Sequence, residues 1–232
     1  MNKEKSLYPF EVDGEIKNIK VDSVYCIGYT GRNKEKTMEH IKELAEIGIP
    51  EPLEVPTLFP VRTSSLSQGN KIEVLGGNTS GEAEIVLIFG DSEDEVYLSV
   101  GSDHTDRSLE AVDINKSKQV CDKPCASKAW KIDNVLSHWD ELELSSQVYD
   151  NGNWLEYQKN PISSIISLEE IQNYLQNKKV KLKNSVIFSG TVPLLDGFKY
   201  GDKFKMQLTD PINSEYIETY YDIKDISGGG ES

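Results

Sequence analysis

Three acidic side chains near the middle of the sequence have the types and spacing of a divalent-cation site. Glu82 and Glu84 precede the apolar run 85–89, and Asp103 follows a second apolar run, 96–100. Residues two apart on a strand face the same way, so both glutamates project to one side, and Asp103 can return to the same end. Three hard oxygen ligands with room for water suit Mg²⁺ or Mn²⁺ better than zinc. The alternative is that these are solvated acids of an acidic protein.

The elements that must position these acids are mainly strands. The two apolar runs are separated by the charged segment 91–95, which predicts a pair of strands. Asp13-Gly14 between two β-type runs predicts a hairpin. Further strands are expected at 24–28, 142–149, 154–157, 186–188, 204–208 and 216–223.

Two helices are expected. The first, 33–47, begins at a capping Asn33, ends at Gly48, and has an apolar stripe of Met38, Ile41, Leu44, Ala45 and Ile47. The second, 167–177, starts with a capping box. A strand-rich sequence with few helices indicates an α+β or mainly-β fold.

Composition excludes several classes of protein. The 232 residues suffice for one large domain or two small ones, and the net charge of −14 argues against nucleic acid or an anionic membrane as partner. Three cysteines cannot complete a disulfide framework, and their spacing lacks the pattern of a structural zinc site. The longest apolar run is five residues, so we expect no signal peptide, no membrane span and a cytoplasmic location.

Several short blocks resemble, in order, those of the fumarylacetoacetate hydrolase superfamily. The segment 24–59 matches an opening block in which a strand ends at glycine, a helix carries His-x-x-Glu, and a proline-rich stretch ends in Phe. Glu-x-Glu before an apolar strand matches 82–88, and Asp-x-Thr-x-Arg matches 103–107. The remaining matches are a lysine ahead of a proline (Lys118), Gly152 to Gln158, Gly190-Thr191 and Gly201-Asp202. The sequence is also similar to a bacterial branch of the superfamily, domain of unknown function family 2848.

The resemblance implies a fold and an assembly. The expected fold is a strand-rich α+β mixed β-sandwich roll with a few short helices. The expected organisation is an N-terminal hairpin (1–23) on a catalytic domain (24–226), with a flexible tail (227–232). A homodimer is also implied.

The resemblance further implies a role for each matching residue. Glu82, Glu84 and Asp103 would hold Mg²⁺ or Mn²⁺, which polarises a substrate carbonyl and stabilises an enolate. The other expected roles are Lys118 as a positive donor with Lys116 as its alternative, His40 and Glu43 as a general base on a mobile lid, and Glu110, Gln158 and Thr191 as substrate contacts. Glu110 departs from the family, which usually has Gln there; the segment between Glu84 and Asp103 is shorter than usual, and the opening helix is longer.

These residues predict a metal-dependent hydrolase or lyase. Its substrate would be a small oxo-acid, cleaved at a carbon–carbon bond or decarboxylated through an enolate. One alternative is a hydratase or isomerase of an unsaturated oxo-acid. Another is a non-catalytic cation- and ligand-binding fold, because the acidic trio fits all three and fold alone does not select the reaction.

Overall fold

The computed structural model describes residues 7–46 and 48–228. Its helices are α1 (Lys34–Glu46), α2 (Arg107–Glu110), α3 (Ile114–Gln119) and α4 (Leu168–Asn177), with short 3₁₀ turns η1 (Thr63–Ser65), η2 (Ile132–Asn134), η3 (Leu136–Glu141) and η4 (Ile162–Ser164). The strands are β1 (Leu7–Val12), β2 (Glu15–Lys20), β3 (Ser23–Gly28), β4 (Thr57–Val61), β5 (Leu66–Ser67), β6 (Lys71–Val74), β7 (Thr79–Ser80), β8 (Ala83–Phe89), β9 (Val96–Ser102), β10 (Thr105–Asp106), β11 (Lys123–Pro124), β12 (Trp130–Lys131), β13 (Glu143–Asp150), β14 (Asn153–Pro161), β15 (Ser185–Thr191), β16 (Lys203–Asp210) and β17 (Glu215–Asp225).

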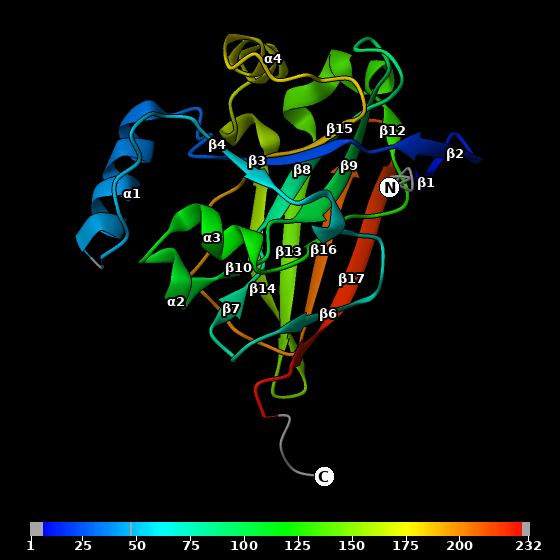
Figure 1. Cartoon of the computed structure of the whole chain (residues 1–232). Coiled ribbons are helices and arrows are strands. Elements are labelled where there is room, and N and C mark those ends of the chain that lie inside the picture. The colour runs from blue at the N-terminus through cyan, green and yellow to red at the C-terminus, as the bar shows by residue number, and fades with distance from the viewer. Residues whose placement is uncertain (1–6, 47, 229–232) are drawn as a thin grey trace, which may run out of the picture.

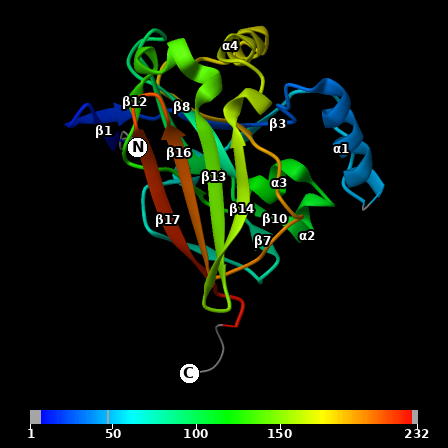
Figure 2. The same ribbon diagram turned by 180° about the vertical axis from the view of Figure 1, so that it is seen from behind.

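Two large sheets form the body of the protein (Figure 1). The six-stranded sheet has the order β12-β9-β8-β15-β3-β4 and is mixed, because β15 pairs parallel with β3 and antiparallel with β8. The five-stranded sheet has the order β14-β13-β16-β17-β6, and its long strands β13, β16 and β17 face the viewer in Figure 2. Both sheets contribute side chains to one apolar core, which includes Leu87 of β8, Val148 of β13 and Met206 of β16. The expected strand-rich α+β fold is therefore confirmed.

Strands β8 and β9 are buried along their whole length. Alternate residues of β8 enter different apolar clusters: Ile85 and Leu87 face the five-stranded sheet, whereas Val86 and Ile88 belong to a second cluster that includes Phe10 of the β1–β2 hairpin. A strand covered on both faces reads as a continuous apolar run. The runs that predicted these two strands thus mark the most deeply buried pair, which also carries the acidic residues.

The helices follow their predicted starts and stops more closely than their predicted packing. Helix α4 has the expected capping box, and Asn33 caps α1 by accepting a hydrogen bond from Lys36 N at 3.1 Å. The stripe expected on α1 is wrong for most of its members, since only Ile41 is buried and Met38 is 42% exposed. Ile47, also in that stripe, and most of the predicted tail 227–232 lie outside the described residues.

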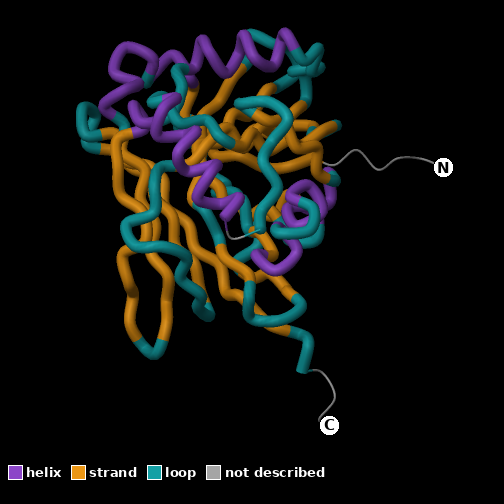
Figure 3. Tube along the Cα trace, turned by 90° about the vertical axis from the view of Figure 1, so that its left-hand side faces the viewer, coloured by secondary structure: helices purple, strands orange, loops and turns teal. Residues whose placement is uncertain are grey.

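Helix α1 stands apart from the two sheets, on the flank that also carries α2 and α3 (Figures 1 and 3). A helix in that position has few neighbours to pack against, which explains why Met38 remains exposed and Leu44 and Ala45 are only half-buried. None of the helices in the described part of the chain combines the length and apolar composition that a membrane crossing requires.

Candidate active site

The strand pair β8–β9 brings the three predicted metal ligands to one end of the six-stranded sheet. In the antiparallel register Glu84 lies opposite Gly101 and Ala83 opposite Ser102. Asp103, directly after β9, donates its backbone N–H to the carbonyl oxygen of Glu82 at 3.0 Å. Glu82 directly precedes β8 and Glu84 lies at its start, and the end of β9 leads into Asp103. The three acidic residues therefore lie at the same end of this strand pair, which is termed the acidic edge of the sheet.

Glu84 carries a buried carboxylate with almost no compensation. The residue is 4% exposed, and its Oε2 accepts one hydrogen bond, from the backbone N of Gly190 at 3.2 Å. Among the described residues no lysine, arginine or histidine lies within ion-pair distance of it. Burial first, and then the negative charge of Asp103, raise the pKa of the Glu84 carboxyl well above its ordinary value. Such a group favours either a proton or a bound cation.

Asp103 is compensated by two lysines. Its Oδ2 accepts a hydrogen bond from Lys118 Nζ at 2.5 Å, and its Oδ1 lies 3.3 Å from Lys123 Nζ. Complete burial of Asp103 would raise its pKa, but the two ammonium groups outweigh burial and hold the pKa below its ordinary value. Asp103 is therefore ionised although it is completely buried.

Arg107 connects two further carboxylates at this edge. Its Nε donates to Ser80 Oγ at 2.6 Å and its Nη1 to Glu110 Oε2 at 2.9 Å. Its Nη2 lies 3.5 Å from Glu82 Oε2 and has no hydrogen-bond partner, while Phe198 covers the guanidinium at 4.2 Å. Burial would lower the Arg107 pKa, but Glu82 and Glu110 raise it, so the arginine is a permanent cation. Arg107 thus holds Glu82 and Glu110 in one cluster.

The donor set fits a divalent cation in its chemistry and charge. Glu82, Glu84 and Asp103 supply hard carboxylate oxygens, and Glu84 forms no salt bridge with any residue that the structure describes. In the present side-chain arrangement, no three acidic, imidazole or thiol groups within 7–46 and 48–228 converge closely enough to hold a metal ion. Binding would therefore involve side-chain rotation at this edge, where Lys118 now occupies Asp103 Oδ2.

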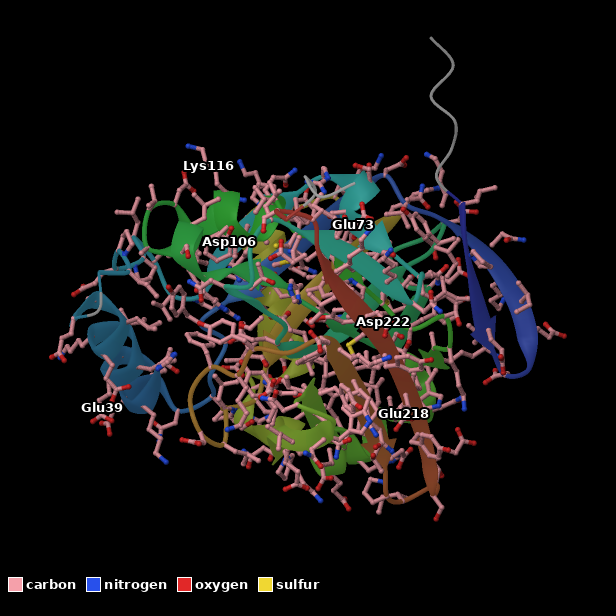
Figure 4. All side chains as sticks on the ribbon, turned by 90° about the horizontal axis from the view of Figure 1, so that it is seen from below. Glu39, Glu73, Asp106, Lys116, Glu218 and Asp222 are labelled. Atoms are coloured by element: carbon pink, nitrogen blue, oxygen red, sulfur yellow. The ribbon has the colours of Figure 1, made fainter. Side chains whose placement is uncertain are left out.

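Of the two lysines considered from the sequence, the structure brings Lys118 to the acids. Lys116, whose side chain is 74% exposed, pairs with Asp113 at 3.1 Å and projects outward near α3 (Figure 4). The sequence pattern did not indicate Lys123, whose side chain is fully buried. Lys123 directly precedes Pro124, so the family's lysine ahead of a proline could also have pointed to Lys123, and only the tertiary structure shows that it too lies against Asp103.

Tyr29 is a second residue that the sequence pattern did not indicate. It follows β3, is half-buried, and has a φ of +60°, in the left-handed region that a non-glycine residue rarely adopts. Burial raises the pKa of its phenol; Lys118 opposes this, while Glu110 and Glu82 add to it. The Tyr29 hydroxyl therefore lies within the field of the acid–lysine cluster.

The predicted substrate contact Gln158 is buried and hydrogen-bonded within the protein. It is 1% exposed, its Nε2 donates to Thr191 Oγ1 at 2.6 Å and to Val192 O at 2.8 Å, and its Oε1 accepts from Ala83 N and Ser146 Oγ. Thr191 Oγ1 in turn donates to Ala83 O at 2.7 Å. The Gln158 amide is thus satisfied within the protein in this arrangement, and its role as a substrate contact stays a prediction. Thr191 remains half-buried beside Glu84's strand.

The predicted base lies on α1. His40 Nδ1 is 3.6 Å from Glu43 Oε2, and the two side chains are 62% and 74% exposed. The pair is therefore present at the expected spacing but exposed to solvent. Helix α1, which carries it, lies on the same flank as α2 and α3 (Figures 1 and 2). His104, next to Asp103, is fully buried between Tyr221 OH at 2.9 Å and Thr79 Oγ1 at 3.0 Å, and burial lowers its pKa well below the ordinary value. His104 is thus a neutral structural group.

Comparison with known proteins supplies a family and a fold. The model of the family "Protein of unknown function (DUF2848)" matches residues 27–221. No curated protein matches the sequence. The structure is similar to fumarylpyruvate hydrolase from Pseudomonas aeruginosa in complex with Mn²⁺ and pyruvate, at a TM-score of 0.63 and 19% identity over 95% of this chain and 97% of that one.

Two further solved structures have similar folds. One is 2-keto-3-deoxy-D-arabinonate dehydratase complexed with magnesium and 2,5-dioxopentanoate, at a TM-score of 0.63 and 17% identity over 90% of this chain and 76% of that one. The other is 4-oxalocrotonate decarboxylase from Pseudomonas putida G7 complexed with calcium and acetate, at 0.55 and 13% identity over 88% and 79%. The family match covers most of the sequence, and the fold is common to all three proteins. The chain belongs to the DUF2848 family and has the fumarylacetoacetate hydrolase-like fold.

Proposed function

We propose that the chain is a divalent-metal-dependent enzyme that acts on a small oxo-acid through an enolate, by carbon–carbon bond hydrolysis or decarboxylation. The observation that carries the proposal is the buried Glu84 carboxylate, which has no lysine, arginine or histidine within ion-pair distance in the described part of the chain and whose pKa the charge of Asp103 raises further. Three similar folds have Mn²⁺, magnesium or calcium bound, and their names describe a hydrolase, a dehydratase and a decarboxylase of oxo-acids. They support the general kind of activity.

Each residue of the cluster has a role under this proposal. Glu82, Glu84 and Asp103 would hold Mg²⁺ or Mn²⁺, and the bound ion would polarise a substrate carbonyl. Lys118 would donate from its ammonium group to the oxygen on which negative charge develops, because its Nζ is already at the acidic edge. Its pKa is raised by Asp103 despite burial, so it acts as a fixed positive donor and not as a base.

The remaining proton transfers are assigned to the α1 pair. Glu43 would orient the His40 imidazole, which would accept a proton directly or through water. In the present structure His40 is exposed, so this role requires α1 to cover the substrate when it binds. Glu110, Gln158 and Thr191 stay proposed substrate contacts; Glu110 and Thr191 are only partly buried near the acids, and Gln158 hydrogen-bonds Thr191.

A second candidate is a non-catalytic cation- and ligand-binding fold. The exposed His40–Glu43 pair favours it, because a base that never reaches the acids leaves only a cation site. A hydratase or isomerase of an unsaturated oxo-acid would use the same metal site as the hydrolase or decarboxylase and would differ from it in the product formed. One screen that identifies products can therefore distinguish the two enzyme classes from each other and from a non-catalytic binding protein.

The deciding experiment is a metal-dependent activity screen. Purified protein would be incubated with Mg²⁺ or Mn²⁺ and acylpyruvates, oxaloacetate or unsaturated oxo-acids, with and without chelator, and products identified by mass. We expect turnover that chelator and Glu84→Gln abolish and that Glu73→Gln, an exposed control on β6, leaves intact. Metal binding without turnover of any oxo-acid would favour the binding fold, and absence of metal binding would refute both proposals.

We also propose a homodimer in the cytoplasm. The chain has a mass of 26.1 kDa, so light scattering at micromolar concentration should give about twice that value. A mass equal to one chain would refute the assembly and leave the proposal for the site untouched.

A further inference from the structure

Lys123 is a charged side chain placed entirely inside the protein. Its side chain has no solvent exposure, and its Nζ donates hydrogen bonds to the carbonyl oxygens of Lys118 at 2.5 Å, His104 at 2.6 Å and Cys121 at 3.2 Å. The only carboxylate oxygen near it among the described residues is Asp103 Oδ1, at 3.3 Å. Buried lysines are rare unless they are paired, so the three carbonyls and Asp103 together account for the position.

The two oxygens of Asp103 are consequently held from different directions. Oδ1 is held from the interior by Lys123 Nζ and by Thr105 Oγ1 at 3.4 Å. Oδ2 is held by Lys118, which is 6% exposed and lies toward the half-buried Tyr29 and Glu110. Removal of Lys118 from Oδ2 would leave Asp103 anchored through Oδ1. The geometry makes Oδ2 the oxygen that is free to change partner.

Lys123 also fixes the residue that competes for Oδ2. The carbonyl of Lys118 is one of its three acceptors, so the same ammonium group holds the backbone of α3 at Lys118 and the carboxylate of Asp103. The same ammonium group donates to the carbonyl oxygen of His104, so it also holds the backbone directly after Asp103. One buried cation therefore sets the distance between the lysine and the carboxylate that face each other across the site.

We propose that Lys123 is a positioning residue for the metal site: it fixes Asp103 through Oδ1 so that Oδ2 is presented to a divalent cation. This inference rests on the proposed function, because it assigns a role to Lys123 only if Asp103 is a ligand. Groups behind a ligand typically change metal affinity by about 10- to 100-fold when mutated.

Charge and positioning make opposite predictions for removal of Lys123. As a charge alone, the ammonium group repels a divalent cation, so its removal would tighten metal binding. As a positioning group, its removal frees Asp103 to rotate and leaves three buried carbonyls without a donor, so metal binding would weaken. The direction of the change in affinity therefore identifies the role.

The test measures Mn²⁺ binding to the full chain by isothermal titration calorimetry. Lys123→Met keeps the length of the side chain and removes its charge and donors. Lys123→Gln removes the charge but retains amide donors for the carbonyls, so it is the variant more certain to fold. Lys116→Met is the matched control, because it removes an exposed positive charge from α3 and should change the Kd less than about twofold.

A second control separates positioning from general loss of stability. Leu175→Ala opens a cavity in α4, at the opposite end of the six-stranded sheet from α2 and α3, and should lower the melting temperature without changing the Kd for Mn²⁺ (Figures 1 and 2). We expect both Lys123 variants to weaken Mn²⁺ binding by about 10-fold or more while retaining a cooperative unfolding transition.

Each other outcome has a definite meaning. Equal or tighter Mn²⁺ binding in a folded Lys123 variant would overturn the positioning role and leave the proposed function standing. Failure of both Lys123 variants to fold would also overturn it, by making Lys123 a determinant of folding. Failure of the wild-type protein to bind Mn²⁺ would instead overturn the proposed function itself.

Discussion

Replacement of Glu84 by Gln should have opposite effects on the metal-free and the metal-loaded protein. The substitution keeps the shape of the side chain and removes its charge. Glu84 is 4% exposed and accepts one hydrogen bond, and the negative charge of Asp103 adds to the rise in pKa that burial causes. Its raised pKa means that the charged form is the unfavourable one in the folded protein. Near pH 7, Glu84→Gln should therefore raise the melting temperature of the metal-free protein.

The raised pKa of Glu84 also determines how the stability difference between Glu84→Gln and wild type depends on pH. A carboxyl whose folded-state pKa is raised contributes stability that is fully present below its unfolded pKa, about 4.3, and is lost as the pH rises through the folded value. The advantage of Gln over Glu at position 84 should consequently vanish at low pH and grow toward neutrality.

The metal-loaded protein should respond in the other direction. At a free Mn²⁺ concentration of 100 Kd, binding stabilises the folded state by about 2.7 kcal/mol. For a chain of this size, about 2–4 °C per kcal/mol gives an increase of about 5–11 °C in the melting temperature of the wild type. If loss of one of three carboxylate ligands weakens binding about 100-fold, the same Mn²⁺ concentration equals the new Kd, and the increase falls to about 0.4 kcal/mol, or about 1–2 °C, in Glu84→Gln.

Thermal unfolding of wild type, Glu84→Gln and Glu73→Gln, each with chelator and with Mn²⁺, measures both effects. Glu73 is an exposed glutamate on β6, so its variant should differ from wild type by less than about 0.5 kcal/mol in both conditions (Figure 4). A full Mn²⁺ shift in Glu84→Gln would refute Glu84 as a ligand. A lower melting temperature of metal-free Glu84→Gln would refute the argument that its charge is uncompensated.

Three further outcomes follow from the structure. Gly190→Ala should destabilise the protein by about 2–4 kcal/mol in urea unfolding, because φ is +137° and a Cβ would lie 2.2 Å from Thr30 Oγ1. Burial would raise the Asp210 pKa, but hydrogen bonds, first from His138, lower it, so Asp210→Asn should cost about 1–3 kcal/mol at pH 7 and progressively less as the pH falls below the ordinary aspartate pKa of about 3.9. His40→Ala should lower kcat by about 10²-fold while Mn²⁺ affinity and melting temperature stay unchanged, and an unchanged kcat would return His40 to a surface role.

Sequence patterns correctly predicted the strands and helix ends that depend on residues close together in the chain. The apolar runs around 85–89 and 96–100 identified β8 and β9 because a strand buried on both faces needs apolar residues throughout. Glu82 directly precedes β8 and bonds through its carbonyl oxygen to Asp103 N, so the acids lie at one end of the β8–β9 pair, as the order of the two runs predicted. Ser167 and Glu170 form the predicted capping box because that interaction lies within one turn.

Tertiary context decided the features that the patterns missed. The apolar residues of α1 looked like a core-facing stripe, but the helix lies on a flank where only Ile41 finds a covered position. Gln158 looked like a free hydrogen-bonding group, yet its strand places it between Ala83 and Thr191. Lys123 pairs with Asp103, twenty residues earlier, and neither residue carries a local sign of the other.

The balance of charge at the site is also a tertiary property, and it bears on the substrate. Four carboxylates at this edge (Glu82, Glu84, Asp103 and Glu110) face three buried cations (Arg107, Lys118 and Lys123), which leaves one negative charge without a partner. A divalent cation reverses this imbalance to one positive charge. A substrate with a single carboxylate then restores neutrality, so the cluster favours binding an anionic oxo-acid after the metal. If the proposed function holds, substrate affinity measured by calorimetry should be much weaker in the presence of chelator, and equal affinity with and without metal would contradict this order.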